Sequence, residues 1–339
     1  MTGILTRRLG SVCASDGQRG VATVTRIGRC HGLCRVVLTA TVAVLAVGVA
    51  GCGGDGDGVD VEVKSTIEFE NGTEPAALAP LPDGGLLVGE RRTGLIRTIT
   101  ADGDLTDPVA HVAVVAAAND QRGLLGLAVT GERIYAAWAR GADGRIVVGE
   151  VSGDGERIVW EGPVSSALAN GGHLAFLPDG RLLVGIGDLQ RPELVDDPAT
   201  PNGKLLALDA EGPPNQVPVP LSGGWNNPFA FVVTADGAIW VADNAPGDTT
   251  ERIGRGDSAA GDRPALPGKR APSALVELEP GRLGLCGYLD GQLDVVEIVN
   301  GEPRVGGEVA TGCRTGAAAL TDGRLAVSDG ERVRILAED

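Results

Sequence analysis

The feature that most constrains the fold of this chain is a short recurring unit, an Asp-Gly turn followed by an apolar segment. The unit occurs six times, with its Asp-Gly pair at residues 83–84, 143–144, 179–180, 236–237, 290–291 and 322–323. Asp-Gly between apolar runs is a strong β-hairpin signal, because glycine readily adopts the positive φ of a tight turn. No stretch shows the sustained period of an amphipathic helix. The repeated turns therefore predict an all-β protein.

The spacing of the six turns predicts the architecture. Six copies over about 280 residues give each unit about 46 residues, which matches one four-stranded blade of a β-propeller. A pair of β-sandwiches also contains many hairpins, but it gives no reason for six similar turns. Residues 61–69 alternate apolar and polar side chains, and we expect them to complete the blade that ends at residues 333–336. The sequence thus predicts a closed, six-bladed β-propeller.

Composition supports a globular body and excludes one class of partner. The 339 residues include 53 glycines and 20 prolines, a density that disfavours long helices, and 43% are hydrophobic, which is enough to fill a core. The net charge is −16, but residues 1–51 carry six Arg and one Asp, a net of +5, which leaves −21 for the remainder. A body this acidic repels phosphate backbones, so nucleic-acid binding is not expected.

The N-terminal region has the layout of an export signal. Residues 36–50 are a run of apolar or near-apolar residues preceded by arginines, too short to span a bilayer comfortably as a helix. The run ends in Val49-Ala50-Gly51-Cys52, which resembles the bacterial lipobox, in which the cysteine is diacylated. An ordinary signal peptide that contains a cysteine is the alternative. We favour a lipoprotein that is exported and lipid-anchored to the outer face of the bacterial cell membrane.

These patterns divide the chain into three parts and leave few cysteines in the mature protein. The predicted parts are a signal peptide at residues 1–51, a flexible tether at residues 52–62 and the propeller at residues 63–339. Besides Cys52, the mature chain retains only Cys286 and Cys313. An even pair in an exported protein permits one disulfide, and two buried free thiols are the alternative.

Several motifs resemble those of one known family. They lie at residues 86–91, 121–128, 170–176, 178–188, 192–198, 202–206 and 224–228. Together they resemble the soluble glucose/sorbosone dehydrogenases, six-bladed propellers that use pyrroloquinoline quinone (PQQ) with calcium. The resemblance covers most of residues 76–336, thins after Asn244, and is most specific over residues 170–228. It implies a propeller that acts on an aldose sugar.

The resemblance also implies where a cofactor would bind. Gln121 aligns with a family glutamine that contacts PQQ, and Arg314 lies near a family arginine in the last blade. Asn226 and Asn227 stand where the family has Arg-Asn before a proline, with the arginine on an anionic oxygen of the cofactor. These four positions are therefore the candidate cofactor-binding residues.

Calcium is the second implied ligand. Residues 243–246 fall where the family bears a Gly-Pro whose backbone carbonyls hold the ion, so Ala245 and Pro246 are candidate ligands. Asp188 begins an acidic loop on the same side and is a third candidate. A solvated acidic turn is the alternative interpretation of that loop. Calcium needs six to eight oxygen ligands, so several groups would have to converge.

Two departures from the family pattern bear on activity. The family's general base, a histidine directly before Asn-Gly-Gly, is replaced by Ala169, and a methyl group accepts no proton. The family's arginine is replaced by Asn226, which removes a charge-assisted bond to an anionic cofactor. His173 is a weak substitute base, because residues four apart on a strand lie about 13 Å apart.

Three hypotheses about function remain open. The first is a degenerate family member that binds a sugar-like ligand but has lost or altered its oxidation. The second is an active PQQ- and calcium-dependent sugar dehydrogenase with a relocated base. The third is a lactonase-like propeller with a central metal held by Glu90, Asn170 and Asp243. All three have a small-molecule ligand and contact the membrane only through the lipid anchor; no protein partner is predicted.

Overall fold

The computed structural model describes residues 61–153 and 155–338. The predicted signal peptide, the lipidation site at Cys52 and the tether up to residue 60 lie outside the described residues. Strand β1 begins at Val61, two residues before the boundary expected for the propeller. Helical structure within the described residues amounts to two 3-10 turns, η1 (Pro192–Leu194) and η2 (Ala260–Asp262), and none of it is long and apolar enough to cross a membrane.

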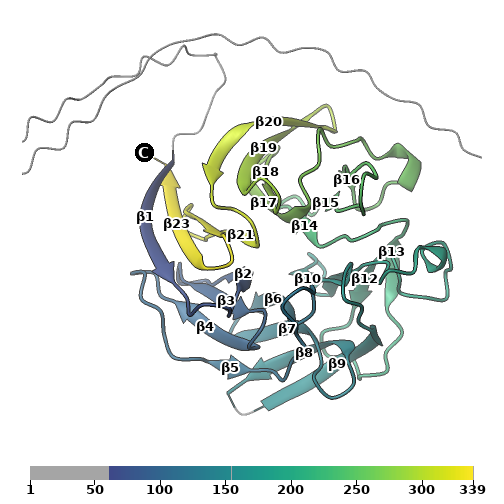
Figure 1. Ribbon diagram of the computed structural model, residues 1–339, viewed down its shortest axis with the longest axis horizontal. Helices are drawn as coiled ribbons and strands as arrows, with labels where there is room; N and C mark the ends of the chain where they lie inside the picture. Colours follow the sequence, from purple (N-terminus) through teal and green to yellow (C-terminus); the bar gives the residue numbers. More distant parts are fainter. Residues whose placement is uncertain (1–60, 154, 339) are drawn as a thin grey trace, which may run out of the picture. The chain divides into compact units, whose positions relative to one another are not determined.

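Six antiparallel sheets surround a central axis, which confirms the predicted all-β, six-bladed propeller (Figure 1). Blade 1 contains β2 (Pro75–Pro80), β3 (Leu86–Glu90), β4 (Leu95–Ile99) and β5 (Ala110–His111). Blade 2 contains β6 (Leu124–Thr130), β7 (Arg133–Ala139), β8 (Arg145–Ser152) and β9 (Gly155–Val164). Blade 3 contains β10 (Gly171–Phe176), β11 (Leu182–Ile186), β12 (Lys204–Leu208) and β13 (Val219–Ser222).

The remaining blades complete the ring. Blade 4 has three strands, β14 (Ala230–Val233), β15 (Ile239–Asp243) and β16 (Arg252–Arg255). Blade 5 contains β17 (Pro272–Glu279), β18 (Arg282–Gly287), β19 (Gln292–Val299) and β20 (Glu302–Thr311). Blade 6 contains β21 (Gly316–Ala319), β22 (Leu325–Ser328), β23 (Arg332–Glu338) and β1 (Val61–Glu68).

The ring closes as the alternating N-terminal segment predicts. Strand β1 pairs antiparallel with β23, with Ile67 opposite Val333 and Thr66 opposite Arg334. The innermost strands β2, β6, β10, β14, β17 and β21 contact one another in succession, and β21 contacts β2 again. Strand β1 is the outermost strand of blade 6, so it covers the edge of β23 and ties the two ends of the described chain together.

The six Asp-Gly turns are distributed one to a blade, but not at equivalent positions. In blades 1, 3, 4 and 6 the turn joins the first two strands of the blade, whereas in blades 2 and 5 it joins the second and third strands. All six glycines have φ between +71° and +87°, as a tight turn requires. The different turn positions explain why the intervals between the motifs are uneven.

The core lies between neighbouring sheets. Val148 of blade 2 packs in one apolar cluster with Leu174 and Val184 of blade 3, and all three are buried. The inner strands approach so closely that a Cβ on Gly126 of β6 would lie 2.3 Å from the carbonyl oxygen of Gly172 in β10. This close approach holds the blades at a fixed spacing around the axis.

Candidate functional site

A cavity of about 700 Å³ lies where the six innermost strands begin. Residues that directly precede or start these strands line it, such as Glu74 before β2, Leu124 at the start of β6 and Thr315 before β21. Each blade contributes to the wall, so the ring brings together loops that are far apart in the sequence. We therefore ask which of the site residues predicted from the sequence line this cavity.

Three of the four candidate cofactor-binding residues line this cavity: Gln121, Asn227 and Arg314. Arg314 is exposed and donates a hydrogen bond from Nη1 to the carbonyl oxygen of Tyr288 at 2.9 Å. The fourth, Asn226, is not part of the wall. The sequence thus identified three side chains that converge on one site.

Gln121 is hydrogen-bonded to the loop that contains Ala169. Its Oε1 accepts a hydrogen bond from the backbone N–H of Ala169 at 2.8 Å, and its own N–H donates to the carbonyl of Ala167 at 2.7 Å. Ala169 has φ of +56°, a left-handed conformation in which Asn, Asp and His are the commonest non-glycine residues. The backbone at this position therefore suits a histidine, but the side chain is a methyl group.

Asn226 faces into the protein and not into the cavity. Its Nδ2 donates to Asp188 Oδ2 at 2.5 Å, and its backbone N–H donates to the carboxylate of Asp243. Asn227 is held in the same way, because its N–H donates to Asp243 at 2.8 Å while its Oδ1 accepts from the N–H of Gly171 at 2.9 Å. These side chains fix three loops against each other.

The two carboxylates beneath this loop are buried. Burial raises the pKa of Asp243 to about 6, although the backbone N–H groups of Asn226 and Asn227 oppose the shift. Burial likewise raises the pKa of Asp188, against the hydrogen bonds from Gln190 and Asn226. Asp188 is absent from the cavity wall and already has these two donors.

His173 lies on β10 but does not line the cavity. Its ring meets the ring of Phe231 edge-on at 4.6 Å and lies 6.1 Å from that of Phe229. Desolvation in this aromatic environment lowers the pKa of His173 to about 4, so the ring is neutral at pH 7. His173 is thus half-buried and packs against these two aromatic rings.

The carboxylates of the cavity wall are all ion-paired with arginines. Four acidic residues line it, and each has a guanidinium nitrogen within 4 Å. The pairs are Glu74 with Arg91 and Arg92, Asp120 with Arg122, Asp329 with Arg332 and Arg334, and Glu331 with Arg332. Burial acts to raise the pKa of Asp120, but hydrogen bonds from Arg122 and the backbone leave it below its ordinary value. Each of these carboxylates therefore already has a cationic partner within the protein.

Carboxamides are the commonest polar groups of the wall. Six line it: Asn71, Asn119, Gln121, Asn170, Asn227 and Asn244. Over residues 61–153 and 155–338, no hydrogen bond engages the side chains of Asn71, Asn119 and Asn244. Phe229 and Tyr288 add aromatic surface. Asn119 lies two residues before the family motif at residues 121–128, so the sequence could have identified it. No sequence motif points to Asn71.

The predicted calcium ligands do not form a calcium site. The carbonyl oxygen of Ala245 accepts a hydrogen bond from the ammonium group of Lys269, which also donates to Thr249 O at 3.1 Å. Pro246 is exposed. Calcium needs six to eight converging oxygens, and in the described part of the chain no three His, Cys, Asp or Glu side chains gather as a metal site would require. The residues present therefore fit an ammonium group and not calcium.

PQQ also fits this wall poorly. The cofactor carries three carboxylates, and the wall presents three arginines, Arg91, Arg92 and Arg314, against four carboxylates. Arg91 and Arg92 are already paired with Glu74. Among the lining groups of the described chain, only Arg314 offers a guanidinium without a carboxylate partner. A trianion would therefore face a wall whose charges are nearly balanced by one another.

The central metal of the lactonase hypothesis is not assembled either. Glu90 accepts hydrogen bonds from Thr93 Oγ1 at 2.6 Å and Arg97 Nε at 2.9 Å within its own blade. Asn170 is bonded through both atoms of its amide to the backbone of Ser166. Neither Glu90 nor Asp243 belongs to the cavity wall.

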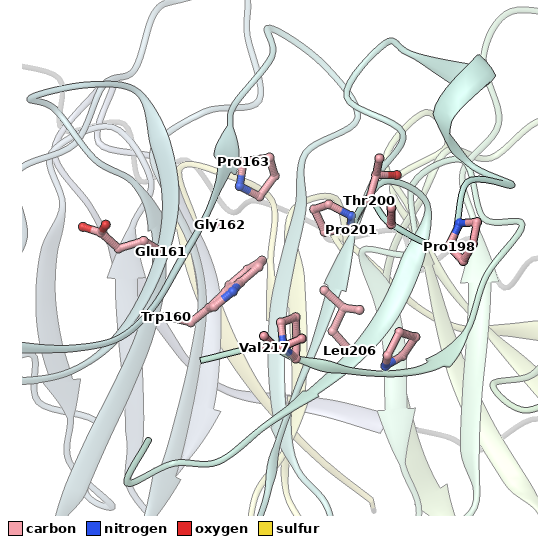
Figure 2. Close-up of a pocket in the computed structure, with 12 residues that line it drawn as sticks. Trp160, Glu161, Gly162, Pro163, Pro198, Thr200, Pro201, Leu206 and Val217 are labelled. Carbon is pink, nitrogen blue, oxygen red and sulfur yellow. The ribbon is translucent and has the colours of Figure 1, made fainter. Parts of the chain in front are cut away.

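A second, smaller hollow lies on the outer part of the propeller (Figure 2). It has a volume of about 310 Å³ between blades 2 and 3 and is lined by Trp160, Leu206 and several prolines. Among the described residues that line it, Glu161 is the one titratable side chain, and it is paired with Arg140 at 2.6 Å. This hollow offers no group for chemistry.

Cys286 and Cys313 form a disulfide, with their Cα atoms 5.4 Å apart. Both residues are fully buried. The bond joins the end of β18 to the loop before β21, and the cavity-lining residues Tyr288 and Arg314 follow directly. The disulfide thus braces one side of the cavity.

Comparisons with known proteins agree with this architecture. The model of the glucose/sorbosone dehydrogenase family matches residues 72–257, more than half of the chain. No curated protein matches the chain. A Thermus thermophilus protein described as an oxidoreductase (glucose dehydrogenase) is 27% identical, with a TM-score of 0.66, over 80% of this chain and 98% of its own.

Two other solved structures share the fold. The PQQ-bound aldose sugar dehydrogenase of Streptomyces coelicolor is 22% identical with a TM-score of 0.66, over 83% of this chain and 98% of its own. The soluble aldose sugar dehydrogenase of Escherichia coli, solved in the apo form, is 23% identical with a TM-score of 0.67, over 82% and 98%. The extent of the family match establishes that this chain belongs to the glucose/sorbosone dehydrogenase family.

Proposed function

We propose that this protein is a lipid-anchored receptor on the bacterial cell surface, which binds a neutral sugar-like ligand in its axial cavity and no longer oxidises it with PQQ. One observation carries the proposal: among the described residues that line the cavity there is no His, Lys or Cys, and each carboxylate is ion-paired with an arginine.

Oxidation of an aldose requires two things of the site. A base must take the proton of the hydroxyl group, and a quinone must accept the hydride. The family position for the base holds Ala169, whose methyl group cannot take a proton, and His173 is packed against Phe231 outside the wall. Asn226 is turned toward Asp188, so it does not replace the family's arginine as a cation for the quinone.

The wall instead suits a neutral molecule rich in hydroxyl groups. A carboxamide both donates and accepts hydrogen bonds, as a hydroxyl group does. The amides of Asn71, Asn119 and Asn244 come from three different parts of the ring and are available to such a ligand. Aromatic rings such as Phe229 provide an apolar surface for the C–H faces of a sugar. The related solved structures described as glucose and aldose sugar dehydrogenases suggest the same ligand class.

Isothermal titration calorimetry of the full-length protein with a panel of aldoses tests this function. We expect saturable binding of at least one aldose with a Kd of about 1 mM or tighter. Asn119→Ala and Asn244→Ala should each weaken it by about fivefold, the value of one or two hydrogen bonds. The matched control, Thr200→Ala in the outer hollow, should leave it unchanged. Absence of binding across the panel would contradict the proposal.

The anchor is a separate part of the proposal. A diacylated Cys52 partitions into a membrane, because each buried CH₂ of an acyl chain contributes about 0.8 kcal/mol. Expression of Cys52→Ser should move the protein from the membrane fraction to the soluble fraction. Membrane retention of that variant would show that another segment anchors the chain.

A further inference from the structure

A positively charged side chain lies at the calcium position that the sequence predicts. Lys269 belongs to residues 258–271, which we call the bridging segment; it follows the family match and leads from blade 4 to blade 5. The ammonium group of Lys269 donates to the carbonyl oxygen of Ala245, the first candidate calcium ligand. The position therefore has a cation supplied by the chain itself.

The ammonium group is held by three oxygens. Besides Ala245 O, Nζ lies 3.1 Å from Thr249 O and 3.2 Å from Glu251 Oε1. An ammonium group has three N–H donors, so these acceptors match its capacity. Two of the three are backbone carbonyls of the loop that follows Asn244, a cavity-lining residue. Lys269 thus fastens this loop.

Glu251, the third acceptor for Lys269, is also held by hydrogen bonds from the backbone. Glu251 is buried, and its oxygens accept hydrogen bonds from the backbone N–H of Arg270 at 2.8 Å and of Ala271 at 3.0 Å. Ala271 lines the cavity and has φ of +52°, a strained conformation for alanine. The network of Lys269 and Glu251 therefore holds two cavity loops together.

A calcium ion cannot be added to this arrangement. Coordination by Ala245 O would bring the divalent ion beside the ammonium group, where like charges repel, and would need several more oxygens at 2.3–2.6 Å. Asp188, the other candidate ligand, is already bonded to Asn226 and Gln190. The candidate ligand oxygens of Ala245 and Asp188 already accept hydrogen bonds from other groups of the protein.

We propose that Lys269 is a built-in replacement for calcium, so that this protein keeps its cavity loops in place without the metal. The ammonium group neutralises Glu251 and ties the carbonyls of Ala245 and Thr249, as an ion would. The proposal concerns stability and metal binding only, and it holds whether or not a sugar binds in the cavity.

Thermal unfolding of the full-length protein in EGTA, in millimolar calcium and in millimolar magnesium tests the proposal. The wild-type Tm should be the same in all three. Lys269→Met keeps the length of the side chain and removes its charge, and should lower the Tm in EGTA by about 3 °C or more. Lys204→Met is the matched control, because Lys204 donates to two carbonyls, Val195 O and Asn202 O, elsewhere in the fold. The decrease in Tm that Lys204→Met causes should be the same in EGTA and in calcium.

Two results would overturn the proposal. The first is a wild-type Tm that rises by more than about 2 °C in calcium but not in magnesium, a difference of roughly 1 kcal/mol in a domain of this size. The second is a Lys269→Met variant as stable as the wild type. The wild-type measurement stands on its own if the variant does not fold.

Discussion

Residues 72–257, matched by the family model, and residues 258–338, which follow it, hold the cavity by different means. In the first region the side chains of Gln121, Asn227 and Asp243 accept hydrogen bonds from backbone N–H groups of neighbouring loops. In the second region the cavity loops are held by an ion-paired lysine, Lys269, and by the disulfide between Cys286 and Cys313.

The difference separates the fold of the family from its chemistry. The family residues retained in the first region are those whose side chains position backbone, and they serve any propeller of this shape. At the positions that the resemblance assigns to the base and to a cofactor contact, this chain has Ala169 and Asn226. Lys269 of the second region donates a hydrogen bond to Ala245, a predicted calcium ligand of the first region. A chain can therefore keep a family's loops while it loses the groups that react.

The largest expected effect tests the close packing of the first region. Gly126→Val would drive a side chain into the carbonyl of Gly172, and we expect a loss of more than about 3 kcal/mol of unfolding free energy. The control is Gly261→Ala in the bridging segment, where no heavy atom lies within 4 Å of the new Cβ. Chemical denaturation measures both. Equal stability of the two variants would contradict the proposed spacing of the blades.

Removal of the disulfide tests the second region. The bond closes a loop with a sequence separation of 27. Cys286→Ser with Cys313→Ser should cost about 3 kcal/mol, because the unfolded chain gains freedom. Denaturant unfolding under non-reducing conditions measures the change, and the double variant should behave as the reduced wild type does. A wild-type protein whose stability ignores reductant would exclude a structural role for the bond.

The pH dependence of stability tests the packing of His173 against its aromatic neighbours in the first region. Its folded pKa of about 4 lies below the ordinary value of 6.5. Folding therefore favours the neutral ring: its contribution is complete above pH 6.5 and is lost as the pH falls toward 4. The loss amounts to up to about 3 kcal/mol. His173→Phe should flatten the pH profile of unfolding over that window relative to the wild type. Identical profiles would place His173 in a solvated environment.

The smallest expected effect concerns the reaction itself. Ala169→His restores the family's base in a backbone conformation that suits it, yet we expect no PQQ-dependent oxidation of an aldose, since the cation for the cofactor is also missing. A dye-linked dehydrogenase assay with PQQ and calcium measures this. Turnover by the single variant would mean that the base alone separates this protein from its active relatives.

The repeat pattern was sufficient to predict the fold, and the resemblance to the family was sufficient to predict part of the site. Asp-Gly turns and the alternation at residues 61–69 depend on local chemistry, so they indicated six blades and the closing strand. They did not indicate that in blades 2 and 5 the Asp-Gly turn joins the second and third strands, because the motif is the same wherever it lies in a blade. Gln121, Asn227 and Arg314 were found at the cavity because they lie in or near family motifs.

Other site features depend on contacts that no local pattern records. The bond between Lys269 and Ala245 joins residues of two loops, and nothing in the sequence around residue 269 indicates its partner. The orientation of Asn226 toward Asp188 likewise follows from packing of blade 3 against blade 4. The same holds for the pairing of Glu74 with Arg91 and Arg92, which are 17 and 18 residues away in the sequence. These contacts decide what the cavity can bind.

The most direct test of a cavity without PQQ chemistry is a titration of PQQ into the full-length protein in the presence of calcium, followed by quenching of tryptophan fluorescence. We predict no saturable binding at tens of micromolar cofactor, because the wall has one unpaired cation for three carboxylates. Tight binding that is lost in EGTA would contradict both the proposed function and the role of Lys269. Such a result would favour the hypothesis that the protein is an active PQQ-dependent sugar dehydrogenase.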